Sequence, residues 1–126
     1  MIQGLESILL GSEDAKRLAK FYREKVGLKV AFEGEMGEGG NVYCFDWKVK
    51  SGFYILDHSK VKGKNKSPQR QILNFEVDNI KPEVKKLDKL GVKKIQDIYH
   101  VESYGWVATF EDTDGNYFQL VQVRPN

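Results

Sequence analysis

The sequence has 126 residues, of which 40% are hydrophobic and 30% are charged. A chain of this length forms one domain with a packed core, and its hydrophobic content excludes intrinsic disorder. Its 20 basic and 18 acidic side chains give a formal net charge of +2, too small to indicate a nucleic-acid-binding surface. No apolar run approaches the ~20 residues that span a bilayer, and no signal-peptide pattern opens the chain. We therefore expect a cytoplasmic protein that binds neither nucleic acid nor membrane.

Two amphipathic helices are predicted from capping residues and from apolar residues at helical spacing. The first begins at the N-cap Ser12 and ends at Gly27, which supplies the left-handed residue after the helix. The second begins near Asp78–Asn79 and ends at Gly91. The stripes expected to pack on sheets contain Leu18 and Tyr22 in the first helix, and Val84 and Leu87 in the second.

Strands are predicted on both sides of each helix. Their expected ranges are 5–11, 28–33, 41–49, 52–57, 71–77, 93–98, 104–111 and 116–123. Tight turns are indicated at Thr113–Asn116 and, more weakly, at Lys50–Gly52. The order is one strand, one helix and three strands, repeated once. Helices and turns share an offset of about 64 residues, which indicates an internal duplication.

The segment from residue 58 to residue 70 has five basic residues and no acidic one. Its position between the two repeats predicts a mobile, solvated linker. The alternative is a basic flap that attracts anionic ligands.

The cysteine and the two histidines lie outside any recognisable cluster. Cys44 falls in an apolar run and is expected to be a buried strand residue, with a reactive thiol as the alternative. His58 opens the basic segment, and His100 is placed in a loop with Glu102 nearby. A surface role is expected for both, with metal ligation as the alternative.

Four motifs together resemble the glyoxalase/bleomycin-resistance superfamily, which has the vicinal-oxygen-chelate (VOC) fold. They are Asp14 through Phe21-Tyr22 to Gly27-Leu28, Phe75–Asp78, Tyr104–Trp106, and Phe110 with Asp112–Asn116 and Phe118–Leu120. The resemblance implies an α+β fold in which two βαβββ modules form a pair of half-barrels within one domain, residues 1–126. Module one covers about 1–58, the basic linker about 58–70 and module two about 71–126. The resemblance also implies a homodimer.

Metal-dependent members of this superfamily take one ligand from the first strand and one from the last strand of each module. The matching positions here are Ser7, Tyr54, Ile72 and Gln119. Their divalent metals require three or four donors such as imidazole or carboxylate. Ile72 cannot ligate a metal, Ser7 is a poor donor, and only Gln119 is a familiar substitute. We therefore predict no metal site and no cofactor.

Strand pairing across the two turns predicts which side chains line the concave side. Pairing around Asp114–Gly115 places Phe110 opposite Gln119, with Trp106 on the same side, and pairing around Lys50–Ser51 places Trp47 opposite Tyr54. Such an aromatic-rich surface suits a planar or apolar small molecule, although the rings could equally fill a core. Asn74 and Glu76 are further inward-facing candidates, or else strand-rim residues bonded to backbone. The predicted ligand-binding residues are Ser7, Trp47, Tyr54, Asn74, Trp106, Phe110 and Gln119.

These observations favour a small-molecule-binding protein without catalytic metal. Such a protein resembles the drug-sequestering branch of the superfamily. One alternative is a metal-dependent lyase, isomerase or dioxygenase of the same superfamily. The other is a scaffold or interaction protein that kept the fold and lost the site.

Overall fold

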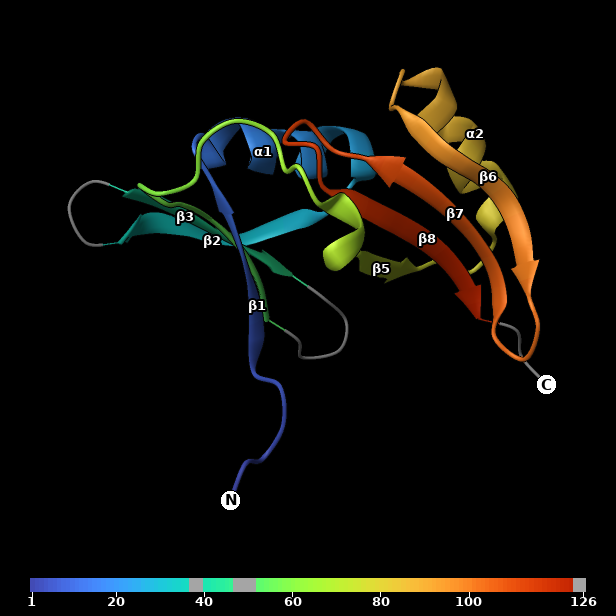
Figure 1. Cartoon of the computed structure of the whole chain (residues 1–126), viewed down its shortest axis with the longest axis horizontal. Helices are drawn as coiled ribbons and strands as arrows, with labels where there is room; N and C mark the ends of the chain where they lie inside the picture. Colours follow the sequence, from blue (N-terminus) through green and yellow to red (C-terminus); the bar gives the residue numbers. More distant parts are fainter. Residues whose placement is uncertain (37–39, 47–51, 124–126) are drawn as a thin grey trace. The chain divides into compact units, whose positions relative to one another are not determined.

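The computed structural model describes residues 1–36, 40–46 and 52–123 of the chain. It divides into two compact units, residues 1–63 and 64–126, which we call module 1 and module 2. Each module has one four-stranded sheet and one helical segment between its first and second strands (Figure 1). In the described part of the chain, no helix combines the length and the apolar character needed to cross a membrane.

Module 1 has its strands in the spatial order β1-β4-β3-β2. The edge strand β1 is parallel to β4, and the other pairs are antiparallel. Its elements in chain order are β1 (Ser7–Ser12), α1 (Ala15–Phe21), η1 (Tyr22–Val26), β2 (Lys29–Met36), β3 (Gly40–Asp46) and β4 (Gly52–Asp57).

Module 2 repeats this arrangement, with the spatial order β5-β8-β7-β6 and β5 parallel to β8. The predicted α+β fold of two βαβββ modules is therefore confirmed. Its elements are η2 (Pro68–Arg70), β5 (Leu73–Glu76), α2 (Ile80–Lys89), β6 (Lys94–Val101), β7 (Gly105–Glu111) and β8 (Tyr117–Val123).

Three strands of each sheet match residue by residue in their pairing, β1, β4 and β3 in module 1 and β5, β8 and β7 in module 2. On β4, Tyr54 lies between Leu9 of β1 and Cys44 of β3. The residue 65 positions later, Gln119, lies between the residues 65 positions after those two partners, Asn74 and Thr109. The duplication predicted from spacing is thus present in the backbone register itself.

Each helix packs on one face of its own sheet. The predicted stripes are confirmed, since Leu18 and Tyr22 in module 1 and Val84 and Leu87 in module 2 are buried. Burying an aliphatic or aromatic side chain of this size stabilises the fold by roughly 1.5–3 kcal/mol. Aromatic rings continue the core beneath each helix: Tyr22 meets Phe53 edge-on, and Phe110 stacks on Phe118.

The last strand of each module holds the N-terminus of the helix. In module 1, Asp57 accepts a hydrogen bond from the Ala15 N–H at 2.7 Å and others from the backbone and side chain of Asn41. In module 2, Gln122 accepts one from the Ile80 N–H at 2.9 Å. The first N–H groups of a helix have no partner within it, so these side chains satisfy donors that would otherwise be orphaned.

The first helix begins later than predicted. Ser12 ends β1 and accepts a hydrogen bond from the Asp14 N–H, while Asp14 is the N-cap, accepting from the Arg17 N–H. The helix then widens into one π-helical stretch, η1, and ends at Gly27, whose φ is 91°. The strand β2 begins two residues after Gly27, whereas β6 begins three residues after Gly91.

The second half of the predicted linker is folded against module 2 rather than free. The Asn65 N–H donates to the Asp114 carbonyl at 2.7 Å, and the Asn65 side chain donates to that of Asn116 at 2.9 Å. A Cβ on Gly115 would lie 3.3 Å from the Asn65 backbone, so glycine permits this close approach. The basic residues of this segment led to the prediction of a solvated linker. The neutral residue Asn65, which lies between two of them, attaches the segment to module 2.

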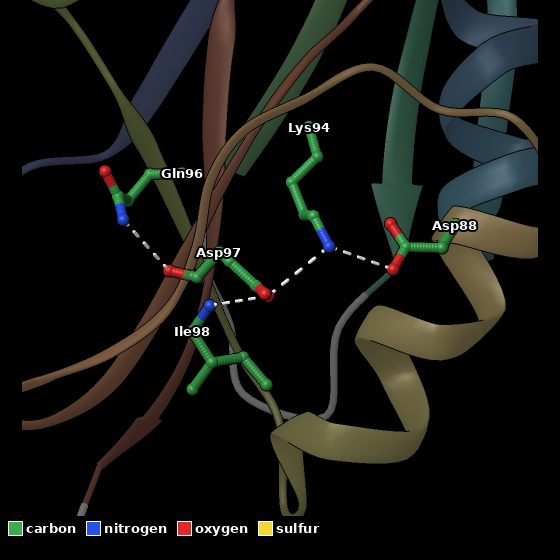
Figure 2. A network of polar contacts seen from close by, with 5 residues as sticks. All are labelled: Asp88, Lys94, Gln96, Asp97 and Ile98. Carbon is green, nitrogen blue, oxygen red and sulfur yellow. Dashed lines mark hydrogen bonds and ion pairs between the residues drawn. The ribbon is translucent and has the colours of Figure 1, made fainter.

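A polar network ties the edge strand β6 to α2 (Figure 2). The Lys94 ammonium bridges Asp88 on α2 at 3.0 Å and Asp97 at 3.3 Å, and Asp97 also accepts the Ile98 N–H at 2.8 Å. The pKa of Asp97 is lowered, first by the Ile98 N–H and then by Lys94, and the pKa of Lys94 is raised, first by Asp88.

Candidate functional site

Each sheet has a helix face and an opposite face, which we call the open face. Strand pairing decides which side chains belong to each. On β7 and β8 the structure pairs Thr109 with Gln119 and Phe110 with Phe118, so the predicted pairing of Phe110 with Gln119 is wrong. Five residues, rather than two, separate the last paired residues Glu111 and Tyr117. An odd loop length shifts the register by one residue and exchanges the two faces.

The corrected register moves two predicted site residues to the helix face of module 2. Phe110 is fully buried there, stacked on Phe118. Trp106 pairs with Gln122, the residue that holds α2, and remains 41% exposed. Its ring lies 4.7 Å from that of His100, which belongs to β6 rather than to the predicted loop because β6 extends to Val101. Neither Phe110 nor Trp106 shares a face with Gln119.

The second aromatic pair is only partly described. Trp47 lies outside the described residues, and so do the first two residues of the predicted turn at 50–52. The described chain resumes at Gly52. The β3 partner of Tyr54 is Cys44, so the predicted pairing of Tyr54 with Trp47 is wrong. Tyr54 itself lies on the open face of module 1, because its neighbours Phe53 and Ile55 fill the core under α1.

The open face of module 1 is largely apolar. Leu9 and Phe32 are both 59% exposed, and Cys44 and Tyr54 are half-buried beside them. Cys44 is therefore not the buried strand residue that the sequence suggested. The pKa of Tyr54 is raised, first by its hydrogen bond to the Cys44 thiol and then by the charges of Cys44 and Glu6. Ser7, half-buried at the start of β1, shares the alternation of Leu9.

The open face of module 2 carries amide and hydroxyl groups instead. Gln119 donates from Nε2 to the Thr109 hydroxyl at 2.9 Å, and Asn74 donates from Nδ2 to the Tyr104 hydroxyl at 3.5 Å. Glu76 is exposed on the same face, since it lies two residues after Asn74 on β5. The expectation that Asn74 and Glu76 face the same side as Gln119 agrees with this register.

Tyr104 is a site candidate that the sequence did not single out as one. It occupies the turn between β6 and β7, and its phenol reaches Asn74 on β5, the strand at the opposite edge of the sheet. The strands β6, β7 and β8 of this sheet curve along their length (Figure 1). Strand alternation alone gives no signal for such a contact.

The donor chemistry at the four positions that the resemblance matched to metal ligands does not fit a divalent metal. Tyr54 and Gln119 are on open faces, Ser7 shares the face of Tyr54, and Ile72 directly precedes β5. None of the four is a His, Asp or Glu, the donors that such metals prefer. Within residues 1–36, 40–46 and 52–123, no three His, Cys, Asp or Glu residues gather as a metal-binding group.

Comparisons with known proteins agree with this architecture. A search of curated protein sequences finds no match. Among solved structures, the antibiotic-binding protein TnmS3 from Streptomyces sp. CB03234 has a TM-score of 0.78 at 20% identity, covering 98% of each chain. The trypanothione-dependent glyoxalase I of Leishmania major has a TM-score of 0.75 at 20% identity, covering 96% of this chain and 87% of that one.

The fosfomycin resistance protein FosX from Listeria monocytogenes has a TM-score of 0.74 at 17% identity, covering 98% of this chain and 96% of that one. At these identities the three structures share the fold. The family model of the Glyoxalase/Bleomycin resistance protein/Dioxygenase superfamily matches residues 4–120. The chain belongs to the glyoxalase/bleomycin resistance protein/dioxygenase superfamily.

Proposed function

We propose that this protein binds a small organic molecule on its open faces and uses no catalytic metal. The observation that carries the proposal is the chemistry of the row Asn74, Gln119 and Thr109, together with Tyr104. These groups are neutral hydrogen-bonding side chains on the face away from the helix, where superfamily enzymes place metal donors. A few placed polar groups beside apolar surface are typical of small-molecule sites.

The apolar open face of module 1 adds support. Large side chains such as Leu9 and Phe32 are exposed there, and exposed apolar patches mark ligand or partner sites more often than isolated surface residues do. The antibiotic-binding protein TnmS3 shares the fold, so binding of a small organic molecule has a precedent in this architecture.

A binding screen on the purified chain tests the proposal. Planar antibiotics and other aromatic compounds are added to the protein, and binding is measured by calorimetry and by the rise in melting temperature. A ligand present at a hundred times its Kd stabilises the folded state by about 2.7 kcal/mol, which such a screen detects. We expect at least one saturable ligand, whose affinity falls on Gln119→Ala.

Elemental analysis of the dialysed protein separates this function from the metal-dependent alternative. We expect no stoichiometric Zn, Ni, Mn or Fe. One ion per chain, lost on Gln119→Ala, would instead support a metal-dependent enzyme. A metal-free protein that binds nothing in the screen would support the scaffold alternative.

A further inference from the structure

The turn that carries Tyr104 has an unusual backbone. The Tyr104 N–H donates to the Val101 carbonyl at 3.0 Å, which closes a four-residue turn, and Ser103 at its third position has a φ of 66°. Turns with positive φ at this position normally contain glycine or asparagine. A serine in the left-handed region costs free energy, so the surrounding structure maintains this conformation. The backbone position from which the Tyr104 side chain extends is therefore fixed.

Two hydrogen bonds determine which polar atoms remain for a ligand. Asn74 uses Nδ2 toward the Tyr104 oxygen, and Gln119 uses Nε2 toward Thr109. The carbonyl oxygens of both amides accept no hydrogen bond from the described residues. The Tyr104 oxygen is already an acceptor, so its own O–H is left to donate. The face therefore presents two acceptors, on Asn74 and Gln119, and one donor, on Tyr104.

The charges on this face disfavour an anion. Glu111 is paired with Lys93 at 3.8 Å, whereas Glu76 forms no ion pair with a described side chain. Lys94 is directed to α2, on the other side of the sheet. Next to the polar row, Val107 and Val121 are buried, whereas Tyr104 is 38% exposed. A flat, uncharged molecule can therefore contact the Tyr104 ring with its polar edge toward the row.

We propose, resting on the binding function above, that Asn74, Gln119 and Tyr104 recognise the N–H/C=O edge of an uncharged planar heterocycle, such as a lactam or an imide. The ligand N–H donates to an amide oxygen of Asn74 or Gln119. The adjacent ligand carbonyl accepts from the Tyr104 O–H. Tyr104 is then a specificity-determining residue, since its ring and its hydroxyl both contact the ligand.

A matched pair of flavin probes tests this proposal on the full chain. Lumiflavin carries an imide N–H between two carbonyls, and 3-methyllumiflavin differs only in that the N–H is blocked. Binding is followed by quenching of flavin fluorescence. We expect lumiflavin to bind about tenfold more tightly, because the methylated probe leaves a protein acceptor without its partner.

Variants assign the effect to the residues. Tyr104→Phe keeps the ring, removes the donor and should weaken lumiflavin binding about fivefold, as loss of one hydrogen bond does. Tyr117→Phe makes the same chemical change at the other end of the sheet and serves as the control. Riboflavin should bind roughly two- to fivefold more tightly than its 5′-phosphate, and Glu76→Gln should reduce that difference.

The outcomes distinguish this inference from the function on which it rests. Equal affinity for lumiflavin and 3-methyllumiflavin would overturn edge recognition and leave small-molecule binding intact. Quenching by neither flavin would also overturn it, and the wider ligand screen would then decide the binding function separately. Preference for lumiflavin that disappears in Tyr104→Phe, but not in Tyr117→Phe, would support it.

Discussion

The two modules share a backbone and differ at equivalent positions of their open faces. Module 1 has the row Leu9, Tyr54 and Cys44, and module 2 has the row Asn74, Gln119 and Thr109. The same strand order therefore carries a thiol, a phenol and an aliphatic side chain in one module and two amides and a hydroxyl in the other.

The helix faces show the opposite behaviour. Both are filled by aliphatic and aromatic side chains, and both helices are held by a side-chain acceptor from the last strand, Asp57 or Gln122. The identity of the acceptor changes, but its position and its bond do not. The helix face therefore determines the fold, and the open face is where binding chemistry can vary.

The largest expected effect separates the two faces of module 2. Phe110→Ala should destabilise the protein by roughly 3–5 kcal/mol, because it leaves a cavity under α2. Gln119→Ala should cost less than about 1 kcal/mol, because its hydrogen bond lies on the open face. Unfolding by urea measures both. Similar losses for the two variants would contradict the face assignment.

A smaller difference should separate the two helix anchors. Asp57→Ala should cost about 2 kcal/mol, since the carboxylate accepts from Ala15 and twice from Asn41, whereas Gln122→Ala should cost about 1 kcal/mol for its single bond. Chemical denaturation of both variants gives the comparison. If Gln122→Ala were the more damaging change, the number of accepted hydrogen bonds would not determine the contribution of each anchor.

The ion-pair network at β6 should make the free energy of unfolding depend on pH in the acidic range. The pKa of Asp97 is lowered from 3.8 in the folded protein. The contribution of the Asp97 carboxylate to the free energy of unfolding is therefore fully present above this ordinary pKa, and it is lost as the pH falls through the folded pKa. Stability should decline less steeply below about pH 5 in Asp97→Asn than in the parent.

The smallest effect concerns a single proton in module 1. Cys44→Ala should bring the pKa of Tyr54 down toward 10.0, because the bond to the thiol is the main cause of its raised value. Titration of tyrosinate absorbance measures the change, with Tyr54→Phe identifying the signal. An unchanged titration would show that Glu6, not Cys44, sets the proton affinity.

The order of elements could be predicted because it depends on local signals. Gly27 and Gly91 mark the helix ends, and apolar stripes mark the buried sides. The faces of β7 and β8 could not, because they depend on loop length. The buried Asp112 carboxylate accepts from the Asp114 N–H and from the backbone and side chain of Asn116. These bonds close a five-residue turn where the residue types indicated a two-residue one.

The same limit applies to the candidate site. Asn74 and Gln119 were identified from the resemblance and from strand alternation, both of which are properties of a continuous strand. The contact of Tyr104 with Asn74 depends on the backbone at Ser103. This property does not follow from residue types taken one strand at a time.

The π-helical stretch η1 explains how the repeat stays in phase. The helix caps Asp14 and Asn79 lie 65 positions apart, but the terminal glycines lie 64 apart, so the first helical segment holds one additional residue. A π-turn accommodates an inserted residue within a helix. The loop after Gly27 is shorter by one, and β2 and β6 begin 65 positions apart again. The two length changes cancel like a pair of opposite frameshifts, and β3 and β4 pair in the same register as β7 and β8 at an offset of 65 positions.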